Sequence, residues 1–156
     1  MIALLQRVAQ AWVEIDGERI ASLGKGLLVL ACAEPADDRE IAARLLDRIL
    51  RYRVFSDEQG RMNRSLLDLR EAQPADPAAA AGLMLVPQFT LAADTRSGLR
   101  PSFTPAAPPA LGRELFEALV ALAHARLPDV QCGRFGADMQ VGLINDGPVT
   151  FWLRLP

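Results

Sequence analysis

The sequence predicts a mixed α/β fold built from several strands and two main helices. Short apolar runs separated by Gly, Pro and Asp indicate strands. Two longer stretches repeat apolar residues at helical spacing. The length of 156 residues suits one domain, residues 1–156, with a substantial hydrophobic core.

The first third of the chain is predicted to be mostly strand. Residues 2–8 and 11–15 are apolar and rich in β-formers, and Asp16-Gly17 is a hairpin signal that needs positive φ. The return strand is expected at about Glu18–Leu23. The unbroken apolar run Leu27–Ala33 is typical of a central strand that is buried on both faces.

A helix is predicted to begin at Asp37, with Glu40 three residues later completing a capping box. Its apolar residues fall on one face as far as Tyr52. Three arginines flank that face and form either a solvated edge or a phosphate-facing stripe: Arg44, Arg48 and Arg51.

The middle of the chain alternates short strands with loops. A short strand is expected at residues 53–55, followed by an irregular stretch at 61–69. The Ala- and Pro-rich segment Glu71–Gly82 is predicted to be a surface loop. The next strand is expected at Leu83–Val86, and the polar loop Ala92–Thr104 after it is long enough to suggest a function.

The last third predicts a helix and two strands. The helix is expected from about Ala110 to Arg126, ended by Pro128. The strands are expected at Met139–Ile144 and Val149–Leu155, with the segment Asn145–Thr150 interrupting them. Within that segment Gly147-Pro148 removes a backbone donor and forms the kind of bond for which a cis peptide is accessible.

Composition excludes several classes of protein. The net charge of −2 and a pI near 5.4 argue against coating of nucleic acid through an overall positive field. No apolar run reaches the roughly 18 residues of a membrane helix, and no signal peptide is recognisable, so a cytoplasmic protein without membrane association is expected.

The shortage of catalytic side chains is also informative. The one histidine, His124, is predicted to face solvent, which argues against Ser-His-Asp and Cys-His sites. Cys32 and Cys132 lack metal or redox spacing and are expected to be reduced thiols, and phosphate-loop and dinucleotide motifs are missing. We therefore expect neither a metal nor a cofactor.

The remaining candidate functional residues suit binding of a ligand by main-chain groups. The candidates are Gln88, Phe89 and Thr90 at a strand end, the loop Arg96–Phe103, the segment Gly133–Met139 and the Gly147-Pro148 step. Thr90 is either a nucleophile, with Asp94, Asp138 or Asp146 as its base, or a strand residue that packs locally.

These candidates resemble the motifs of the D-aminoacyl-tRNA deacylase family. Pro87–Leu91 is similar to the family's Ser-Gln-Phe-Thr-Leu motif, and Asn145–Thr150 matches its Asn-x-Gly-Pro-Val-Thr motif. Further blocks that resemble family sequence cover the chain nearly end to end: Leu5–Val8, Ala93–Arg96, Arg100–Phe103 and Gly133–Gln140.

The resemblance implies a barrel-like arrangement of antiparallel-rich sheets with the two helices outside. It also implies a homodimer with each active site at the subunit interface. There a cis Gly147-Pro148 motif enters the partner's pocket, binds the substrate amino group and leaves no room for an L side chain, and Arg7 helps to hold the motif. Phe135, Gly136, Ala137 and Met139 resemble the part that packs on the terminal adenine of tRNA.

The implied reaction is hydrolysis of the ester of D-aminoacyl-tRNA, and also of glycyl-tRNA. Backbone N–H groups around Gln88, Phe89 and Thr90 would stabilise the oxyanion. Either Thr90 or the 2′-hydroxyl of the terminal ribose assists; the scarcity of titratable groups favours the ribose. Two other functions stay open: a less selective deacylase, because Pro87 replaces the usual serine, and a non-catalytic dimer that binds RNA 3′ ends.

Overall fold

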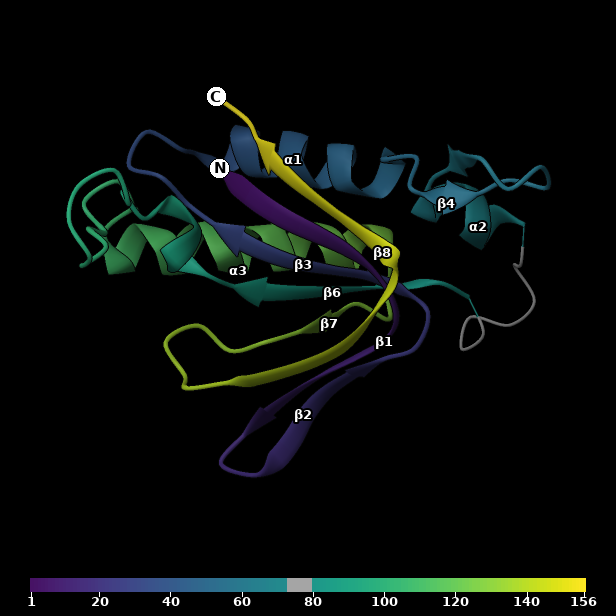
Figure 1. Ribbon diagram of the computed structural model, residues 1–156, viewed down its shortest axis with the longest axis horizontal. Coiled ribbons are helices and arrows are strands. Elements are labelled where there is room, and N and C mark those ends of the chain that lie inside the picture. Colours follow the sequence, from purple (N-terminus) through teal and green to yellow (C-terminus); the bar gives the residue numbers. More distant parts are fainter. Residues whose placement is uncertain (73–79) are drawn as a thin grey trace.

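The computed structural model describes residues 1–72 and 80–156 (Figure 1). It has the predicted mixed α/β architecture, with strands, three α-helices and one 3-10 helix in the described part of the chain. In order, the elements are β1 (Ile2–Ile15), β2 (Glu18–Leu23), β3 (Gly26–Cys32), α1 (Arg39–Arg51), β4 (Phe55–Ser56), β5 (Met62–Arg64), α2 (Leu66–Glu71), β6 (Gly82–Pro87), η1 (Phe89–Ala92), α3 (Pro109–Arg126), β7 (Gln131–Cys132) and β8 (Gln140–Arg154).

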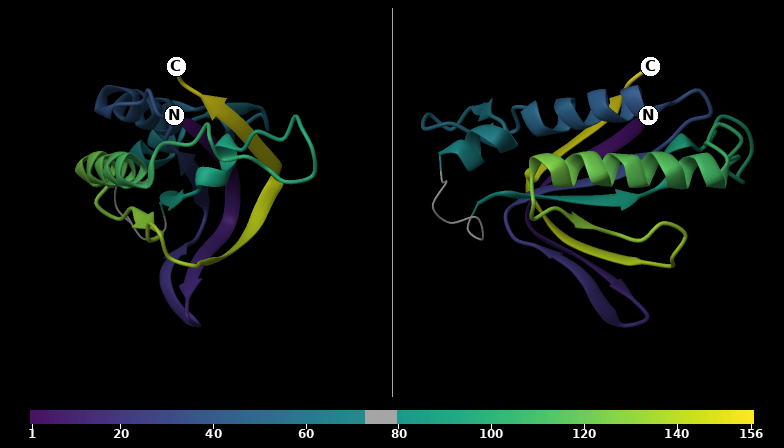
Figure 2. Two further views of the ribbon diagram at one scale, coloured as in Figure 1. Left: turned by 90° about the vertical axis from the view of Figure 1, so that its left-hand side faces the viewer. Right: turned by 180° about the vertical axis from the view of Figure 1, so that it is seen from behind.

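The main sheet curves into a nearly closed barrel, which confirms the predicted arrangement (Figure 2). Its strand order is β2-β1-β3-β6-β7, and β8 pairs with β1 along most of its length. The pairs of β1 are antiparallel, whereas β3–β6 and β6–β7 are parallel. The backbone N–H of Ser22 in β2 donates to the side chain of Gln131 in β7, and this contact brings the two ends of the strand order together.

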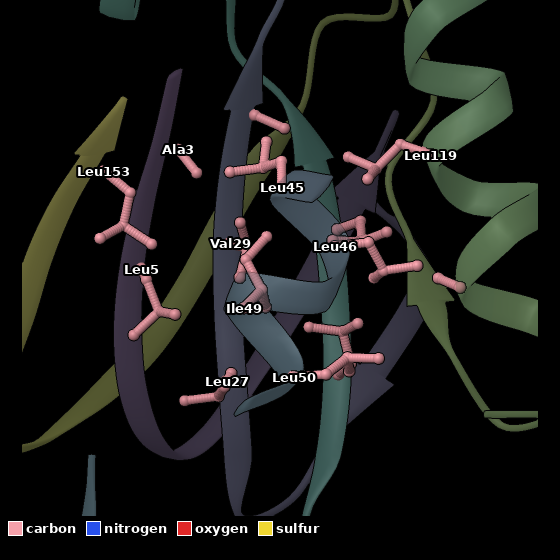
Figure 3. Close-up of a cluster of buried hydrophobic side chains, with 14 of the residues drawn as sticks. Ala3, Leu5, Leu27, Val29, Leu45, Leu46, Ile49, Leu50, Leu119 and Leu153 are labelled. Atoms are coloured by element: carbon pink, nitrogen blue, oxygen red, sulfur yellow. The ribbon is translucent and has the colours of Figure 1, made fainter. Parts of the chain in front are cut away.

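Strand β3 contributes side chains to two cores. Leu27, Val29 and Ala31 point into the larger core, between the sheet and the helices α1 and α3 (Figure 3). Leu28, from the opposite face of the strand, packs with Met84 and others in a second cluster. Because successive strand residues point to opposite faces, the predicted apolar run of this strand is explained by burial on both sides.

Both long terminal strands are more continuous than predicted. β1 is one strand, although the sequence predicts two, and β8 continues through Asn145–Thr150. The stretch predicted to be irregular contains β5 and α2, whose capping box joins Ser65 and Asp68. That helix has only six residues, too few to show a clear apolar period.

The predicted helix cap is wrong by one residue. The side chain of Asp38, not Asp37, accepts from the backbone N–H of Ile41. Asp37 is buried and accepts from the amino group of Met1 at 2.6 Å and from the backbone N–H of Glu34. A contact with the other end of the chain therefore overrides the local signal.

The prediction that His124 faces solvent is confirmed, because the residue is exposed on α3. The three arginines of α1 are also exposed, which both interpretations of that stripe allow. The predicted surface loop Glu71–Gly82 falls largely on residues 73–79, outside the described residues. No helix in the described ranges is long and apolar enough to cross a membrane.

The parallel pairing of β3 with β6 depends on two glycines that face each other. A Cβ on Gly26 would lie 2.1 Å from the carbonyl oxygen of Gly82. We predict that Gly26→Ala lowers the free energy of unfolding by at least about 2 kcal/mol, because backbone atoms cannot move aside as a side chain can.

Urea unfolding of the wild type and two variants tests this prediction. Gly24→Ala is the matched control, since a Cβ there would meet nothing within 4 Å. Equal unfolding midpoints for the two variants would contradict the prediction.

Candidate active site

A cavity of about 590 Å³ opens where the parallel strands β3 and β6 end. Its walls come from these strand ends, the turn after β6, the start of α3 and the segment before β8. Most of the lining is apolar. The residues are Met1, Ala31, Cys32, Ala33, Val86, Pro87, Gln88, Phe89, Phe103, Ala106, Ala107, Pro109, Gly112, Phe116, Phe135, Gly136, Ala137, Asp138, Met139 and Val141.

The turn after β6 presents main-chain donors at this cavity. The N–H of Gln88 donates to the carbonyl of Ala31 at 2.8 Å, so it is not free to bind a ligand. η1 begins at Phe89, and the first N–H groups of a helix have no partner within it. Among the described residues, the Phe89 and Thr90 N–H groups have no hydrogen-bond partner.

The Thr90 side chain has no base beside it. Its hydroxyl is exposed and accepts a hydrogen bond from the amide of Gln88, and an amide cannot remove a proton. Thr90 does not line the cavity, although Gln88 and Phe89 do. The ring of Phe89 packs edge-on against Phe103 at 5.0 Å, and both rings are partly exposed at the cavity mouth.

Two of the predicted candidate bases are held in ion pairs. Asp94 accepts three hydrogen bonds from Arg96, chiefly from its side chain, and these hold the pKa of Asp94 well below its usual range. Asp146 pairs with Arg7 at 3.0 Å. Asp138 lines the cavity. In residues 1–72 and 80–156 no group of three metal-ligating side chains is close enough to hold an ion.

The segment before β8 forms a mostly apolar wall of the cavity. The guanidinium of Arg113 lies 4.9 Å from the ring centre of Phe135 and covers one face of the ring. The sulfur of Met139 accepts from the backbone N–H of Arg134 and lies close to Gly133, where a Cβ would approach it to 2.8 Å. These contacts hold the predicted residues Phe135, Gly136, Ala137 and Met139 together at the cavity.

The Gly147-Pro148 step lies on a wide bulge of β8. Gln6 pairs with Thr150 and Val8 pairs with Asn145, so residues 146–149 stand opposite Arg7 alone. The peptide bond between Gly147 and Pro148 is cis, and Gly147 has a φ of 126°, which favours glycine. Both residues are exposed.

Two side chains brace this bulge. Asn145 donates to the Thr150 hydroxyl at 2.8 Å and accepts from the Val149 N–H at 3.2 Å. Arg7 donates to the Asp146 carbonyl and, at 2.7 Å, to the carbonyl of Val54. The strand therefore holds Gly147-Pro148 outward in one orientation.

The predicted residues fall into two separate groups. The turn at Gln88–Phe89 and the wall at Phe135–Met139 meet in one cavity, but Arg7, Gly147 and Pro148 do not line it. The bend of β8 lies at the other end of the sheet from the loops that follow β6 (Figure 1).

Sequence reasoning missed Cys32, which ends β3 and lines the cavity. Burial raises the pKa of its thiol from 9.0 to about 11; a hydrogen bond from the Ala92 backbone opposes this shift, and the Glu34 carboxylate adds to it. The parallel register that pairs Ala31 with Pro87 would have indicated this position, because it brings Cys32 beside the turn after β6. Single-sequence patterns do not disclose that register.

Comparisons with known proteins agree with this architecture. A family model described as D-Tyr-tRNA(Tyr) deacylase matches residues 4–154. A D-aminoacyl-tRNA deacylase of Azotobacter vinelandii is 60% identical over 154 residues, 99% of each chain. One of Pseudomonas putida (strain GB-1) is 58% identical over 155 residues, 99% of this chain and all of the relative.

Two solved structures share the fold. A c-Myc DNA unwinding element binding protein superposes with a TM-score of 0.89 at 32% identity, covering 100% of this chain and 99% of the other. A structure described as a probable eukaryotic D-amino acid tRNA deacylase gives a TM-score of 0.81, with 97% of each chain covered. Its 14% identity supports likeness of fold alone.

The matching family model and the similar deacylases together identify the protein as a hydrolase. With the family model spanning nearly the whole sequence, the chain belongs to the D-Tyr-tRNA(Tyr) deacylase family.

Proposed function

We propose that this protein hydrolyses the ester bond of D-aminoacyl-tRNA, releasing the amino acid and free tRNA. The observation that carries the proposal is the cavity lined by Phe89 and by the apolar segment before β8. Phe89 begins a turn in which its own N–H and that of Thr90 have no hydrogen-bond partner among the described residues. The ester carbonyl of the substrate would bind at the main-chain donors of the turn, and its adenine would pack against the apolar wall. The substrate would place the enzyme in the cytoplasm.

The reaction proceeds by attack of water on the ester carbonyl carbon. The carbonyl oxygen becomes an oxyanion, which the N–H groups of Phe89 and Thr90 stabilise. Loss of one such donor costs other enzymes about 10²–10³ in kcat. The bond to the ribose oxygen then breaks, that oxygen takes a proton, and the new carboxyl group releases one.

The wall formed by Phe135, Gly136, Ala137 and Met139 receives the terminal adenine. Arg113 covers one face of the apolar Phe135 ring. A purine packs on such a surface through its own flat face. Recognition of the adenosine thus leaves the amino acid at the cavity mouth, near Gln88 and Phe89.

The chirality filter comes from a second copy of the chain. Gly147 and Pro148 are exposed, lie on a bulge that is braced by hydrogen bonds, and are separate from the cavity of their own chain. Entry of this bulge into the partner's cavity would present main-chain carbonyls to the substrate amino group. A homodimer would also cover exposed apolar side chains such as Trp152, Ile144 and Phe89.

Steric rejection of an L side chain has a simple consequence for specificity. The filter reads no feature of the D side chain, so many D-amino acids pass. Glycine has no side chain to reject, and glycyl-tRNA is therefore also a substrate. Pro87 removes one N–H and the hydroxyl of the serine usual in the family, but leaves the donors of Phe89 and Thr90 in place.

We predict that the wild type cleaves D-tyrosyl-tRNA and leaves L-tyrosyl-tRNA intact. Gly147→Ala should lower the rate on the D ester by at least about tenfold, because its Cβ would lie 2.7 Å from the Val149 side chain and 3.1 Å from Arg7. Parallel deacylation assays of the two esters measure both effects.

The matched control is Gly17→Ala, which also has a positive φ but meets nothing within 4 Å. Comparable cleavage of both esters by the wild type would mean a less selective deacylase. Stoichiometric binding of aminoacyl-tRNA without turnover would instead favour a non-catalytic RNA-binding dimer.

We also predict that Thr90 is dispensable for the chemical step, which the 2′-hydroxyl of the terminal ribose assists. Thr90→Ala and Thr90→Val should keep kcat on the D ester within about tenfold of the wild type, since both retain the backbone N–H. Single-turnover deacylation, with Thr95→Val as an exposed control, measures this. A loss beyond about a hundredfold with binding intact would make Thr90 the nucleophile or its assistant.

A further inference from the structure

The thiol of Cys32 contacts the turn that carries the Phe89 and Thr90 N–H groups. The side chain is buried at the end of β3, with 2% of its surface exposed. Its sulfur lies 3.4 Å from the carbonyl oxygen of Phe89 and 3.4 Å from that of Ala33. A thiol can donate only one hydrogen, so these two carbonyls share it.

The Phe89 carbonyl and the Thr90 N–H belong to the same peptide unit. In a planar trans peptide they point in opposite directions. A group that holds the carbonyl on the inner side of the turn therefore fixes the N–H toward the outer side. Cys32 is such a group.

A second contact from β3 holds the other end of the turn. The carbonyl of Ala31, the residue before Cys32, accepts from the Gln88 N–H at 2.8 Å. Two consecutive residues of one strand thus anchor the start and the middle of the turn. Cys32 also packs with Ala92, the last residue of η1, in a small buried cluster.

We propose that Cys32 is a positioning residue for deacylation: by donating to the Phe89 carbonyl, its thiol orients the Thr90 N–H toward the oxyanion. The inference rests on the proposed function, in which that N–H stabilises the reacting carbonyl oxygen. The raised pKa keeps the thiol protonated, and hence a donor, throughout the neutral range. The same protonation makes Cys32 a poor nucleophile.

A series of substitutions separates donation from packing. Cys32→Ala removes the donor; Cys32→Ser keeps a donor, shorter but stronger than a thiol. The matched control is Cys132→Ala, which removes the other thiol from β7, away from the cavity lining. Steady-state deacylation of D-tyrosyl-tRNA gives kcat and KM for each, and thermal melting verifies folding.

For Cys32→Ala we expect kcat to fall about tenfold while KM stays within about twofold of the wild type. A misoriented Thr90 N–H would still stabilise the oxyanion in part, so the loss should be smaller than the loss on deleting such a donor. Cys32→Ser should recover kcat to within about threefold of the wild type, and Cys132→Ala should match the wild type.

Three results would overturn the inference. A wild-type kcat in folded Cys32→Ala would show that the thiol does not orient the donor. Equal losses in the Ala and Ser variants would assign the effect to packing. A wild type that cleaves neither the D nor the L ester would overturn the proposed function, and with it any catalytic consequence of Cys32; the first two results leave the proposed function intact.

Discussion

The parallel pairing of β3 with β6 is the constraint on which the rest of the structure depends. It sets Gly26 against Gly82 at one end and Ala31 against Pro87 at the other. The close approach of the two glycines leaves room for backbone alone. Leu27 and Val29 of β3 pack in one core, and Leu28 packs in the other. A shift of the strand register by one residue would therefore turn each of these side chains to the wrong face of the sheet.

The same pairing builds the cavity. Both strands end at one edge of the sheet, and the ladder continues one step further through the bond from Gln88 N–H to the Ala31 carbonyl. The chain then turns into η1, where the N–H groups of Phe89 and Thr90 have no partner within the described residues, and Cys32 contacts the Phe89 carbonyl. The proposed site is thus made mainly from the main chain, supported by a thiol and apolar walls, which accounts for the scarcity of titratable groups in it.

The second half of the proposed site depends on β1. Its Arg7 reaches the Asp146 carboxylate and the Val54 carbonyl, and with Asn145 holds a bulge that carries the cis Gly147-Pro148 bond. Gly147 and Pro148 do not line the cavity of their own chain. In the proposed dimer each subunit would supply the catalytic cavity of one site and the chirality filter of the other.

Much of the fold and part of the candidate site were predictable from the sequence. Apolar runs identified the main strands, helical spacing identified α1 and α3, and motif resemblance identified the turn after β6 and the Gly147-Pro148 step. Long-range contacts were not predictable. Asp37 looked like a cap but binds Met1, and Cys32 looked like an inert thiol but lies in the cavity, because partners distant in sequence decide both positions.

The claim that two chains share each site is tested most directly by combining two inactive variants. Gly147→Ala/Pro148→Ala damages the filter, and Ala137→Trp fills the cavity. Subunits with different affinity tags, co-expressed and purified through both tags, give the heterodimer. We expect about half the wild-type rate on D-tyrosyl-tRNA per heterodimer, because one undamaged cavity meets one undamaged filter. A heterodimer as inactive as either parent would show that each chain works alone and would contradict the account.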